Sequence, residues 1–462
     1  MGLKYIVVAT LLLVLILAIT CSGHTTHYIK TTPDTACPAE PCLTLSEYAQ
    51  QPHNYFISDT TLLLLPGVHV LSVNFTVENV SSFEICSQLQ LLSPTNIDQK
   101  SRVVCEGLVG LFFRNVSQMT LDGLTFNSCG KSAIGYGPEP DYLSTYSVSI
   151  IFGEDVNIFD CSFKDSVGTA LGVYYSTLHL HGNRFTNNCN VHNDGSHRLG
   201  TGFVFDTCTT FITANRILQN TSAKYGGGIT AKNSILNFNG SNIFRNNSAK
   251  YGGGINACNT TLQFTGDITF ADNSAQCGGG ISALNCTVNI TGNSSFTSNT
   301  AEHYGGGIYM QNCVLISTGN GTFSDNSAKH FGGGIKAYGS TLNLTGNNAF
   351  KGNSAAYGGG LSINKSTLYL PGSCSFTENI AEHHGGGICV WNSTLISTGN
   401  SMFRENSAKN FGGGIKVDGS TLNFMGNLVF RDNSAEYGGG ISLDKSILNL
   451  TGENDLINPP VQ

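Results

Sequence analysis

Hydrophobic and polar residues alternate in short runs along most of the chain. In the segment GGGIKAYGSTLNLTGNNAFKGNSAAY, which spans Gly332 to Tyr357, the alternating apolar positions are Ile335 and Ala337, Leu342 and Leu344, and Ala349 or Phe350. A period of two is typical of β-strands, whereas an amphipathic helix repeats every 3.6 residues. Clusters of turn-forming residues, YGS, TGN and NSAAYGGG, separate the runs. The pattern therefore predicts three short strands in each such segment.

The same segment recurs at a fixed spacing. A GGG triplet begins at positions 226, 252, 278, 305, 332, 358, 385, 412 and 438, so successive steps are 26 or 27 residues. A second motif, Phe-x-x-Asn, keeps this spacing, and its asparagines are Asn247, Asn273, Asn299, Asn326, Asn353, Asn379, Asn406 and Asn433. Repetition of one small unit at this period indicates a solenoid. We predict an all-β fold, a single-stranded parallel β-helix with one coil per 26 or 27 residues.

In a stack of such coils, equivalent residues lie over one another. We expect the glycine triplets at a sharp corner that needs φ > 0 or a close backbone approach. The residue before the triplet is Tyr or Phe in most coils, with Cys277 and His384 as exceptions, which predicts an aromatic ladder. The motif asparagines predict an amide ladder, because an amide can donate to one coil and accept from another. Ser317 and Ser397 occupy inward positions, so those coils either shift register or bury a hydroxyl.

The N-terminal segments differ from the repeats. The chain begins with MGLKYIVVATLLLVLILAIT, which predicts a secretory signal peptide over residues 1–23, with a signal anchor as the alternative. Residues 24–55 contain a cysteine pair and a capping box, Thr44-x-x-Glu47, which predicts a short helix, and we expect this segment to cap the first coil. We assign residues 56–220 to irregular coils, 221–452 to the regular repeats and 453–462 to a C-terminal tail.

Composition and charge indicate a folded chain that does not bind nucleic acid. The 462 residues include 56 glycines, yet 40% are hydrophobic and only 11% are charged, unlike a disordered glycine-rich linker. The net charge is −7, with no basic stripe for nucleic acid. No second long apolar run follows the first one, so we expect no membrane span after signal cleavage.

Cysteine usage agrees with export. Of 15 cysteines, Cys21 leaves with the signal peptide, and the even number that remains is compatible with disulfides in an oxidising compartment. Cys37 and Cys42 are one candidate pair. Cys286 and Cys313 are another, because each lies eight residues after the first glycine of adjacent coils, within the Cα range of a disulfide. Two buried thiols are the alternative there, and other pairings stay open.

The sequence also contains many acceptor motifs for N-glycosylation. The N-x-[ST] candidates are Asn74, Asn79, Asn115, Asn220, Asn239, Asn246, Asn259, Asn285, Asn289, Asn293, Asn320, Asn343, Asn364, Asn392 and Asn449. Because Asn, Ser and Thr are abundant, some of these motifs arise by chance. We expect several to carry glycans if the source is eukaryotic.

The combination of GGGI and Phe-x-x-Asn over residues 210–450 resembles the repeats of the chlamydial polymorphic outer-membrane proteins, which carry GGA-[ILV] and FxxN. The resemblance implies a right-handed β-helix of the pectin-lyase-like class and, by analogy, adhesion at a cell surface. The sequons and the CLTLSEYA segment look more like animal extracellular proteins that use the same repeat.

Several acidic residues and histidines are candidates for catalysis or metal binding, and each also has a structural explanation. Glycoside hydrolases need two carboxylates, and lyases need a carboxylate-bound calcium with a nearby base. The best local candidates are Glu154, Asp155, Asp160, Asp165, His181 and Arg184, but acids at turns explain them equally well. The residue before the motif asparagine is often acidic, which suggests calcium or, more simply, solvated turns. His303 and His383 lie three coils apart, too far to share zinc. We therefore predict no catalytic residue, metal or cofactor.

These observations favour a non-enzymatic secreted or cell-surface scaffold. We expect it to act in adhesion and to bind an extracellular protein or glycan along an extended face. A polysaccharide lyase or glycoside hydrolase of the same fold is one alternative. The other is a structural spacer of a larger membrane-anchored receptor. The sequence indicates neither the ligand nor the oligomeric state.

Overall fold

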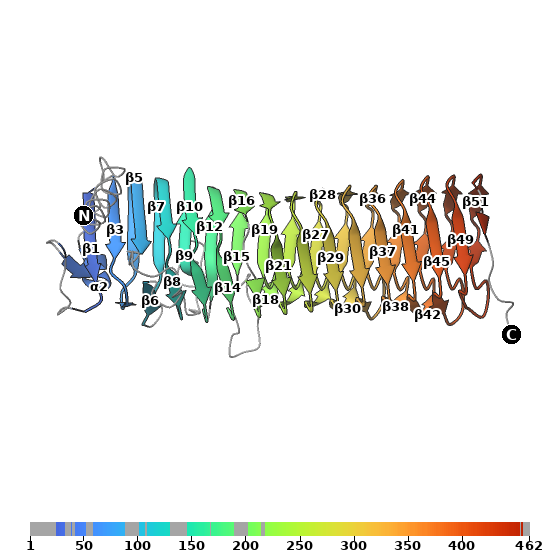
Figure 1. Cartoon of the computed structure of the whole chain (residues 1–462), viewed down its shortest axis with the longest axis horizontal. Helices are drawn as coiled ribbons and strands as arrows, with labels where there is room; N and C mark the ends of the chain where they lie inside the picture. Colours follow the sequence, from blue (N-terminus) through green and yellow to red (C-terminus); the bar gives the residue numbers. More distant parts are fainter. Residues whose placement is uncertain are drawn as a thin grey trace, which may run out of the picture.

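The protein is an elongated stack of coils that runs from the N-terminal end to the C-terminal end (Figure 1). The computed structural model describes residues 25–32, 38, 42–51, 59–87, 101–106, 109–129, 146–166, 168–188, 202–213, 218–452 and 454–455. Every strand pairing in these ranges is parallel, and each coil pairs with the next one along the chain. The chain therefore folds as a parallel β-solenoid, which confirms the predicted fold class.

A regular coil has four short strands rather than the three expected. In the coil that starts at Gly332 they are β35 (Ile335–Tyr338), β36 (Thr341–Leu344), β37 (Asn348–Lys351) and β38 (Ser354–Tyr357). The fourth strand was assigned to a turn because its residues are small and polar. Its inward residue is an alanine, and Ala301, Ala328 and Ala355 form a small buried cluster of their own. A single small apolar residue per strand gives too weak an alternation to detect.

The strands form three sheets, and the first sheet contains two columns. One column contains β9 (Tyr146–Ile151), β12 (Thr169–Tyr174), β15 (Phe203–Asp206), β19 (Ile229–Lys232), β23 (Ile255–Cys258), β27 (Ile281–Leu284), β31 (Ile308–Gln311), β35, β39 (Leu361–Asn364), β43 (Ile388–Trp391), β47 (Ile415–Asp418) and β50 (Ile441–Asp444). The other contains β10 (Asp155–Phe159), β13 (Thr177–His181), β16 (Thr209–Thr213), β20 (Ile235–Asn239), β24 (Thr261–Phe264), β28 (Thr287–Ile290), β32 (Val314–Ser317), β36, β40 (Thr367–Leu370), β44 (Thr394–Ser397), β48 (Thr421–Phe424) and β51 (Ile447–Leu450).

The second and third sheets complete each coil. The second sheet contains β4 (Val68–Leu71), β6 (Arg102–Cys105), β8 (Thr125–Asn127), β11 (Ser162–Lys164), β14 (Arg184–Thr186), β17 (Leu218–Gln219), β21 (Asn242–Arg245), β25 (Ile268–Ala271), β29 (Ser294–Thr297), β33 (Gly321–Ser324), β37, β41 (Cys374–Thr377), β45 (Ser401–Arg404), β49 (Leu428–Arg431) and β52 (Asn454–Asp455). The third contains β18 (Ser222–Tyr225), β22 (Ser248–Tyr251), β26 (Ser274–Cys277), β30 (Thr300–Tyr304), β34 (Ser327–Ala328), β38, β42 (Ile380–His384) and β46 (Ser407–Ala408).

The N-terminal coils are less regular, and a short helix covers them. The first sheet begins with β1 (Thr25–Lys30), β2 (Cys42–Thr44), β3 (Thr60–Leu64) and the long strands β5 (Phe75–Ser87) and β7 (Leu111–Asp122). The helix α2 (Leu45–Ala49) starts at the predicted capping box, where Glu47 N donates to Thr44 Oγ1 and Thr44 N donates to Glu47 Oε2. Its Tyr48 ring lies 6.3 Å from the Phe75 ring. The helix thus caps the core at this end.

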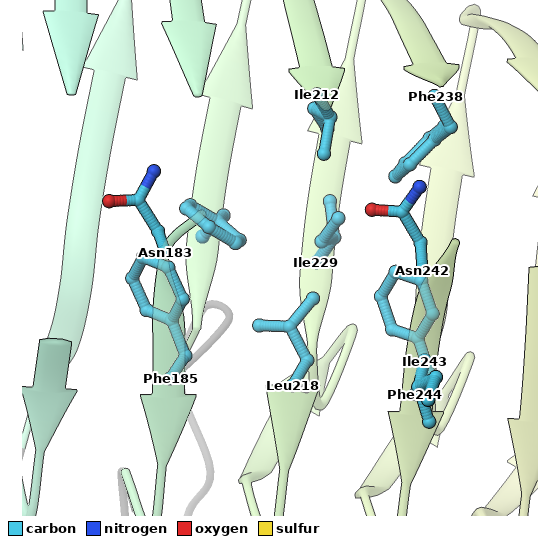
Figure 2. A pocket seen from close by; sticks show the side chains of 10 residues that line it. Asn183, Phe185, Ile212, Leu218, Ile229, Phe238, Asn242, Ile243 and Phe244 are labelled. Atoms are coloured by element: carbon cyan, nitrogen blue, oxygen red, sulfur yellow. The ribbon is translucent and has the colours of Figure 1, made fainter. Parts of the chain in front are cut away.

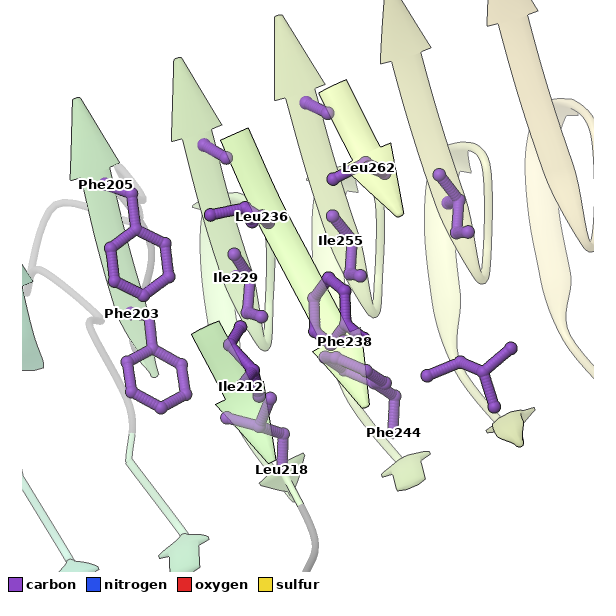
Figure 3. Close-up of a cluster of buried hydrophobic side chains, with 14 of the residues drawn as sticks. Phe203, Phe205, Ile212, Leu218, Ile229, Leu236, Phe238, Phe244, Ile255 and Leu262 are labelled. Carbon is purple, nitrogen blue, oxygen red and sulfur yellow. The ribbon is translucent and has the colours of Figure 1, made fainter. Parts of the chain in front are cut away.

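The core is one continuous column inside the coils (Figure 3). Phe244, Phe270 and Phe296 stack with ring centroids 4.7 and 4.9 Å apart, and the motif phenylalanines continue this stack to Phe430. Ser317 and Ser397 stay in register with the inward leucines of neighbouring coils. These coils therefore bury hydroxyls, and each hydroxyl donates to the carbonyl two residues later.

The glycine triplets make the corner before each Ile-rich strand. Gly252, the first of its triplet, has φ of +63°, and a Cβ on Gly253 would overlap the carbonyl oxygen of Gly279 in the next coil. The Cβ of any other residue is too large for this approach. The residues before the triplets form the expected ladder, with Tyr225 and Tyr251 stacked at 5.7 Å and Phe331 and Tyr357 at 5.1 Å.

The motif asparagines form the predicted amide ladder. Asn326 is fully buried, and its Oδ1 accepts from the backbone N and the Nδ2 of Asn299, each at 3.0 Å. Its Nδ2 donates to Phe296 O at 2.8 Å and to Asn353 Oδ1 at 3.0 Å. The same pattern repeats at the other motif asparagines from Asn247 to Asn406, so the ladder satisfies one backbone N–H and one carbonyl in each coil.

The cysteines correct one expectation. Cys286 and Cys313 are free thiols, so the disulfide expected between them is not formed. Cys286 N donates to Cys313 Sγ at 3.2 Å, and the same position in the next coil is Ser340, whose Oγ accepts from Cys313 N at 3.0 Å. Each thiol also donates to the carbonyl two residues earlier. Both cysteines thus replace a hydroxyl in a serine and threonine ladder that includes Ser234, Thr260, Ser366, Ser393, Ser420 and Ser446.

Two other cysteine assignments concern the N-terminal coils. Cys105 and Cys129 form a disulfide, with Cα atoms 4.8 Å apart, that sequence spacing left open. Cys42 is disulfide-bonded, and Cys37, its expected partner, lies outside the described residues. Residues 1–23, the expected signal peptide, and most of the expected tail also lie outside them.

Candidate functional site

The interior of the solenoid offers no room for a ligand at the cavity shown in Figure 2. This cavity holds about 10 Å³ and lies among Phe185, Ile229 and Phe238 of the core, with Asn183 and Asn242 at its edge. A volume of this size admits about one water molecule. Asn183 already donates to Ile158 O and accepts from Cys161 N. A binding site for a larger ligand therefore has to lie on the outer surface.

An open groove of about 710 Å³ lies on the outer surface of the irregular coils. It crosses the corner where β9, β12 and β15 end and where β10, β13 and β16 begin. Its lining residues are Asn115, Ser117, Phe152, Gly153, Glu154, Tyr175, Ser176, Thr177, Thr207 and Thr209. The volume falls in the range usual for small-molecule sites.

This corner has the same backbone conformation in successive coils. The residue that follows the first strand has φ between +45° and +59° in a column that contains Asn115, Phe152, Tyr175, Thr207, Asn233, Asn259, Asn285, Asn312, Gly339, Lys365, Asn392, Gly419 and Lys445. Asparagine and glycine are the residues that adopt this left-handed conformation readily. A bulky residue there is a genuine outlier. Five members of this column are neither asparagine nor glycine, namely Phe152, Tyr175, Thr207, Lys365 and Lys445, and Phe152 and Tyr175 are its aromatic residues.

Phe152 and Tyr175 form an exposed aromatic pair. Their ring centroids lie 5.1 Å apart with an interplanar angle of 19°, so the rings stack along the solenoid axis. Phe152 is 50% exposed and Tyr175 is 55% exposed. The two rings thus present apolar surface to solvent at a position where the backbone is strained.

Hydroxyl groups form the floor beside the rings. Ser176 Oγ accepts from Gly153 N at 2.9 Å and donates to Tyr174 O at 2.7 Å, which fixes the corner between the two coils. Thr177 and Thr209 lie in register on neighbouring strands, and both are partly exposed. Glu154 is exposed at the edge of the groove. The floor therefore offers donors and acceptors beside an apolar platform.

A second aromatic pair lies farther along the same strands. His179 of β13 stacks on Phe211 of β16 with ring centroids 4.9 Å apart, and Phe211 is 40% exposed. His179 Nε2 lies 3.8 Å from Asp155 Oδ1 of β10. Both side chains point outward, because their neighbours Leu178, Leu180 and Ile212 fill the core.

The structure divides the acidic candidates among different corners. Glu154 lines the groove and Asp155 contacts His179, but Asp160 and Asp165 are turn residues that follow β10 and β11 with φ of +48° and +53°. His181 lies at the end of β13, and Arg184 begins β14 in the second sheet. The turn explains Asp160 and Asp165, because aspartate tolerates the left-handed region.

The acidic column before the motif asparagines has the same explanation. Asp272, Asp325, Glu378, Glu405 and Asp432 all have φ between +54° and +57°. Some face basic neighbours, with Lys351 Nζ 3.7 Å from Glu378 Oε1. Among the described residues, no group of three or more metal-binding side chains converges. His303 stacks on His330 of the adjacent coil, with ring centroids 5.6 Å apart. The sequence analysis compared His303 only with His383 and did not identify this neighbour.

Most glycosylation candidates lie at exposed positions. Asn74, Asn79, Asn115, Asn220, Asn239, Asn246, Asn259, Asn285, Asn293, Asn320, Asn392 and Asn449 are exposed, whereas Asn289, Asn343 and Asn364 are partly buried. Asn285 Nδ2 donates to Asn259 Oδ1 at 3.3 Å, so some acceptor amides are already engaged with the next coil. Glycosylation stays a prediction.

A buried lysine lies outside the groove, next to the glycine corner. Lys336 is 6% exposed, and its Nζ lies 4.9 Å from the Phe331 ring centroid and 5.7 Å from that of Trp391. Nζ donates to Ser362 Oγ at 3.2 Å. Burial lowers the pKa of Lys336 to about 8.

Comparison with protein families agrees with the repeat. Residues 293–311 match the family model of the Chlamydia polymorphic membrane protein repeat, which confirms the resemblance noted in the sequence. The chain has no significant match among curated proteins. Within the described residues, no helix is long and apolar enough to span a membrane.

The matches among solved structures are distant in sequence and have low TM-scores. PfbA, a surface adhesin of Streptococcus pneumoniae, is 9% identical, and the match covers 85% of this chain and 83% of that one at a TM-score of 0.25. An alpha-1,3-glucanase from Streptomyces thermodiastaticus is 9% identical over 94% of this chain and 69% of that one, at 0.29. The A-module of a mannuronan C-5 epimerase from Azotobacter vinelandii is 9% identical over 90% and 94%, at 0.24.

Proposed function

We propose that this protein is a non-enzymatic extracellular scaffold that binds glycans in the groove of Phe152 and Tyr175 and so acts in adhesion. The observation that carries the proposal is the pair of exposed aromatic rings in a corner that asparagine and glycine occupy in most neighbouring coils. Each ring in this conformation costs about 1–2 kcal/mol relative to an ordinary backbone. Strain of this kind clusters at functional sites.

The chemistry of the groove suits a sugar. The C–H face of a pyranose is apolar and packs on an aromatic ring, and the hydroxyls at the ring edge need polar partners. Thr177, Thr209 and Thr207 supply hydroxyls beside the Phe152 and Tyr175 platform. The rigid first sheet holds all of these residues, so little ordering is needed when a ligand binds.

An enzyme of the same fold is the second hypothesis. Glu154 lines the groove and Asp155 follows it, which gives two carboxylates near the platform. Hydrolysis needs two carboxyl groups that flank the scissile bond. Release of reducing or unsaturated ends from a polysaccharide, lost in Glu154→Gln, would favour this hypothesis over a scaffold.

A glycan array tests the proposed function. The wild-type chain, Tyr175→Gly and the control Lys445→Gly are applied to immobilised neutral and acidic glycans, with and without calcium. Lys445 has the same left-handed conformation in the last coil and lies far from the groove, so its replacement makes the same backbone change elsewhere. We expect retention of the wild type and of the control, and loss of retention in Tyr175→Gly. Equal retention of all three would contradict the proposal.

A further inference from the structure

We infer that His179 and Phe211 form a second sugar subsite beside the groove, so that the ligand is a neutral oligosaccharide of three or more sugars that lies along the strand direction, across the solenoid axis. The inference rests on the proposed function, because it extends the platform of Phe152 and Tyr175. It adds the orientation, the minimum length and the charge class of the ligand.

The spacing of the two aromatic pairs sets the length. Thr177 to His179 spans two strand residues, about 7 Å, and Tyr175 precedes this strand at the corner, so the two platforms lie about 7 to 13 Å apart. The rings of a disaccharide are too close together to cover both platforms. Phe152 and Tyr175 come from two adjacent coils, as do His179 and Phe211. Each platform therefore extends over two coils along the solenoid axis.

The surface between the platforms is flat and carries hydroxyls. Thr177 lies between Tyr175 and His179 along the chain, and it pairs with Thr209, which lies between Thr207 and Phe211. Leu178 and Leu180 point into the core, so these two residues leave the outer face of β13 clear for a chain of sugars. A central sugar would rest on the threonines, and a terminal sugar would rest on each aromatic pair.

The charges favour a neutral ligand. The residues that line the groove include one carboxylate, Glu154, and no lysine, arginine or histidine. The adjoining His179 already faces a second exposed carboxylate, Asp155, at 3.8 Å. A uronate would bring like charges together beside Glu154 and Asp155, which is unfavourable. Neutral hexose or N-acetylhexosamine chains meet no such repulsion.

Calorimetric titration tests the inference. Cello-, laminari- and chito-oligosaccharides of two to five sugars, and oligogalacturonates of the same lengths, are titrated into the wild-type chain, Phe211→Ala, Tyr175→Gly and the control Asn237→Ala. Asn237 occupies the position of Phe211 in the next coil. We expect the wild-type affinity for one neutral series to rise about tenfold between two and four sugars, which is about 1.4 kcal/mol. Phe211→Ala should lose this rise and keep its affinity for the disaccharide.

The outcomes separate the two proposals. A flat length series in the wild type, an unchanged rise in Phe211→Ala, or equally tight binding of oligogalacturonates would overturn the second subsite. Binding that Tyr175→Gly abolishes in each of these cases would leave the proposed function intact. Absence of binding of every sugar by the wild type would overturn both.

Discussion

At the scale of single residues, the left-handed corner holds structural residues in most coils and the aromatic residues of the proposed site in two of them. In most coils this corner holds asparagine or glycine, and the asparagine amides form a short ladder, as from Asn233 to Asn312. Phe152 and Tyr175 break this pattern and expose their rings. Thr207, Lys365 and Lys445 also depart from asparagine and glycine at this corner, so what distinguishes Phe152 and Tyr175 is the exposed apolar surface of their stacked rings.

Replacing Phe152 therefore tests whether its ring lowers stability and strengthens glycan binding. We expect Phe152→Asn to raise the free energy of unfolding by about 1 kcal/mol, because asparagine tolerates the left-handed region. The same variant should weaken glycan binding. Urea unfolding followed by circular dichroism gives the stability, and Lys445→Asn serves as a control that gains stability without a loss of binding. A destabilised Phe152→Asn would show that the ring contributes packing rather than strain.

The thiols of Cys286 and Cys313 give a second residue-scale prediction. Because each acts as a hydroxyl in the serine ladder, serine should replace either one at little cost. Cys313→Ala should cost about 1–3 kcal/mol, since it leaves the buried Cys286 N–H without an acceptor. Alkylation of the unfolded, unreduced protein should label both cysteines. Peptide mapping that finds them joined would contradict the structure.

Lys336 should make the free energy of unfolding depend on pH. Its pKa is about 8 in the folded chain and about 10.5 when exposed, so between these values the unfolded state binds more protons than the folded state. Stability contributed by this residue must then rise with pH. We expect the unfolding free energy of the wild type, relative to that of Lys336→Met, to increase by about 1.4 kcal/mol per pH unit from pH 8 to 10.5. A constant difference across this window would indicate an unshifted lysine.

At the scale of elements, the ladders hold the coils in register. The amide ladder joins the second and third sheets, and each asparagine bonds to the coils on both sides. Glycine triplets allow the close approach, and the stacked phenylalanines fill the interior. Because every coil repeats the same contacts with its neighbours, stability is approximately a sum over adjacent coils.

Replacing one asparagine of the ladder should therefore lower the unfolding free energy more than replacing an exposed asparagine. Asn326→Ala removes the acceptor of Asn299 N and the donor to Phe296 O, both buried. We expect a loss of about 3 kcal/mol in unfolding free energy. Asn427→Ala, at an exposed turn, is the matched control and should change stability little. Similar losses in both variants would mean that the ladder adds nothing beyond local turn structure.

Sequence alone predicted the elements where a position repeats. The period, the strands of the first two sheets, the glycine corner and the Asn247 to Asn433 ladder follow from residues in phase. The sequence left Cys286 and Cys313 open between a disulfide and two buried thiols because only their two coils were compared, although serine or threonine at the same position in the other regular coils indicated a hydroxyl ladder. The strand around Ala355 was missed because one small apolar residue gives little alternation.

The groove was not predictable from the sequence for a related reason. Phe152 and Tyr175 lie in irregular coils, where the variable spacing hides their equivalence to the asparagines of the regular corner. Only the backbone φ values place Phe152, Tyr175 and Asn259 in one column. Of the acidic candidates, the structure brings Glu154 and Asp155 to this surface and leaves Asp160 in a turn.

At the scale of the whole molecule, a long uniform stack presents one locally different surface. The regular coils from β19 to β49 repeat the same corners and ladders, whereas the groove lies in the irregular coils towards the N-terminal end (Figure 1). The proposed recognition surface therefore involves only a few coils, and the regular coils repeat one set of contacts beside it.

Amide hydrogen exchange with a bound oligosaccharide tests this account most directly. The probe is the neutral oligosaccharide of highest affinity in the length series, compared with the unliganded chain. We predict added protection confined to peptides that contain residues 152–155, 175–179 and 207–211, with none in the coils from 221 to 452. Protection spread along the regular coils, or confined to them, would contradict the assignment of the site.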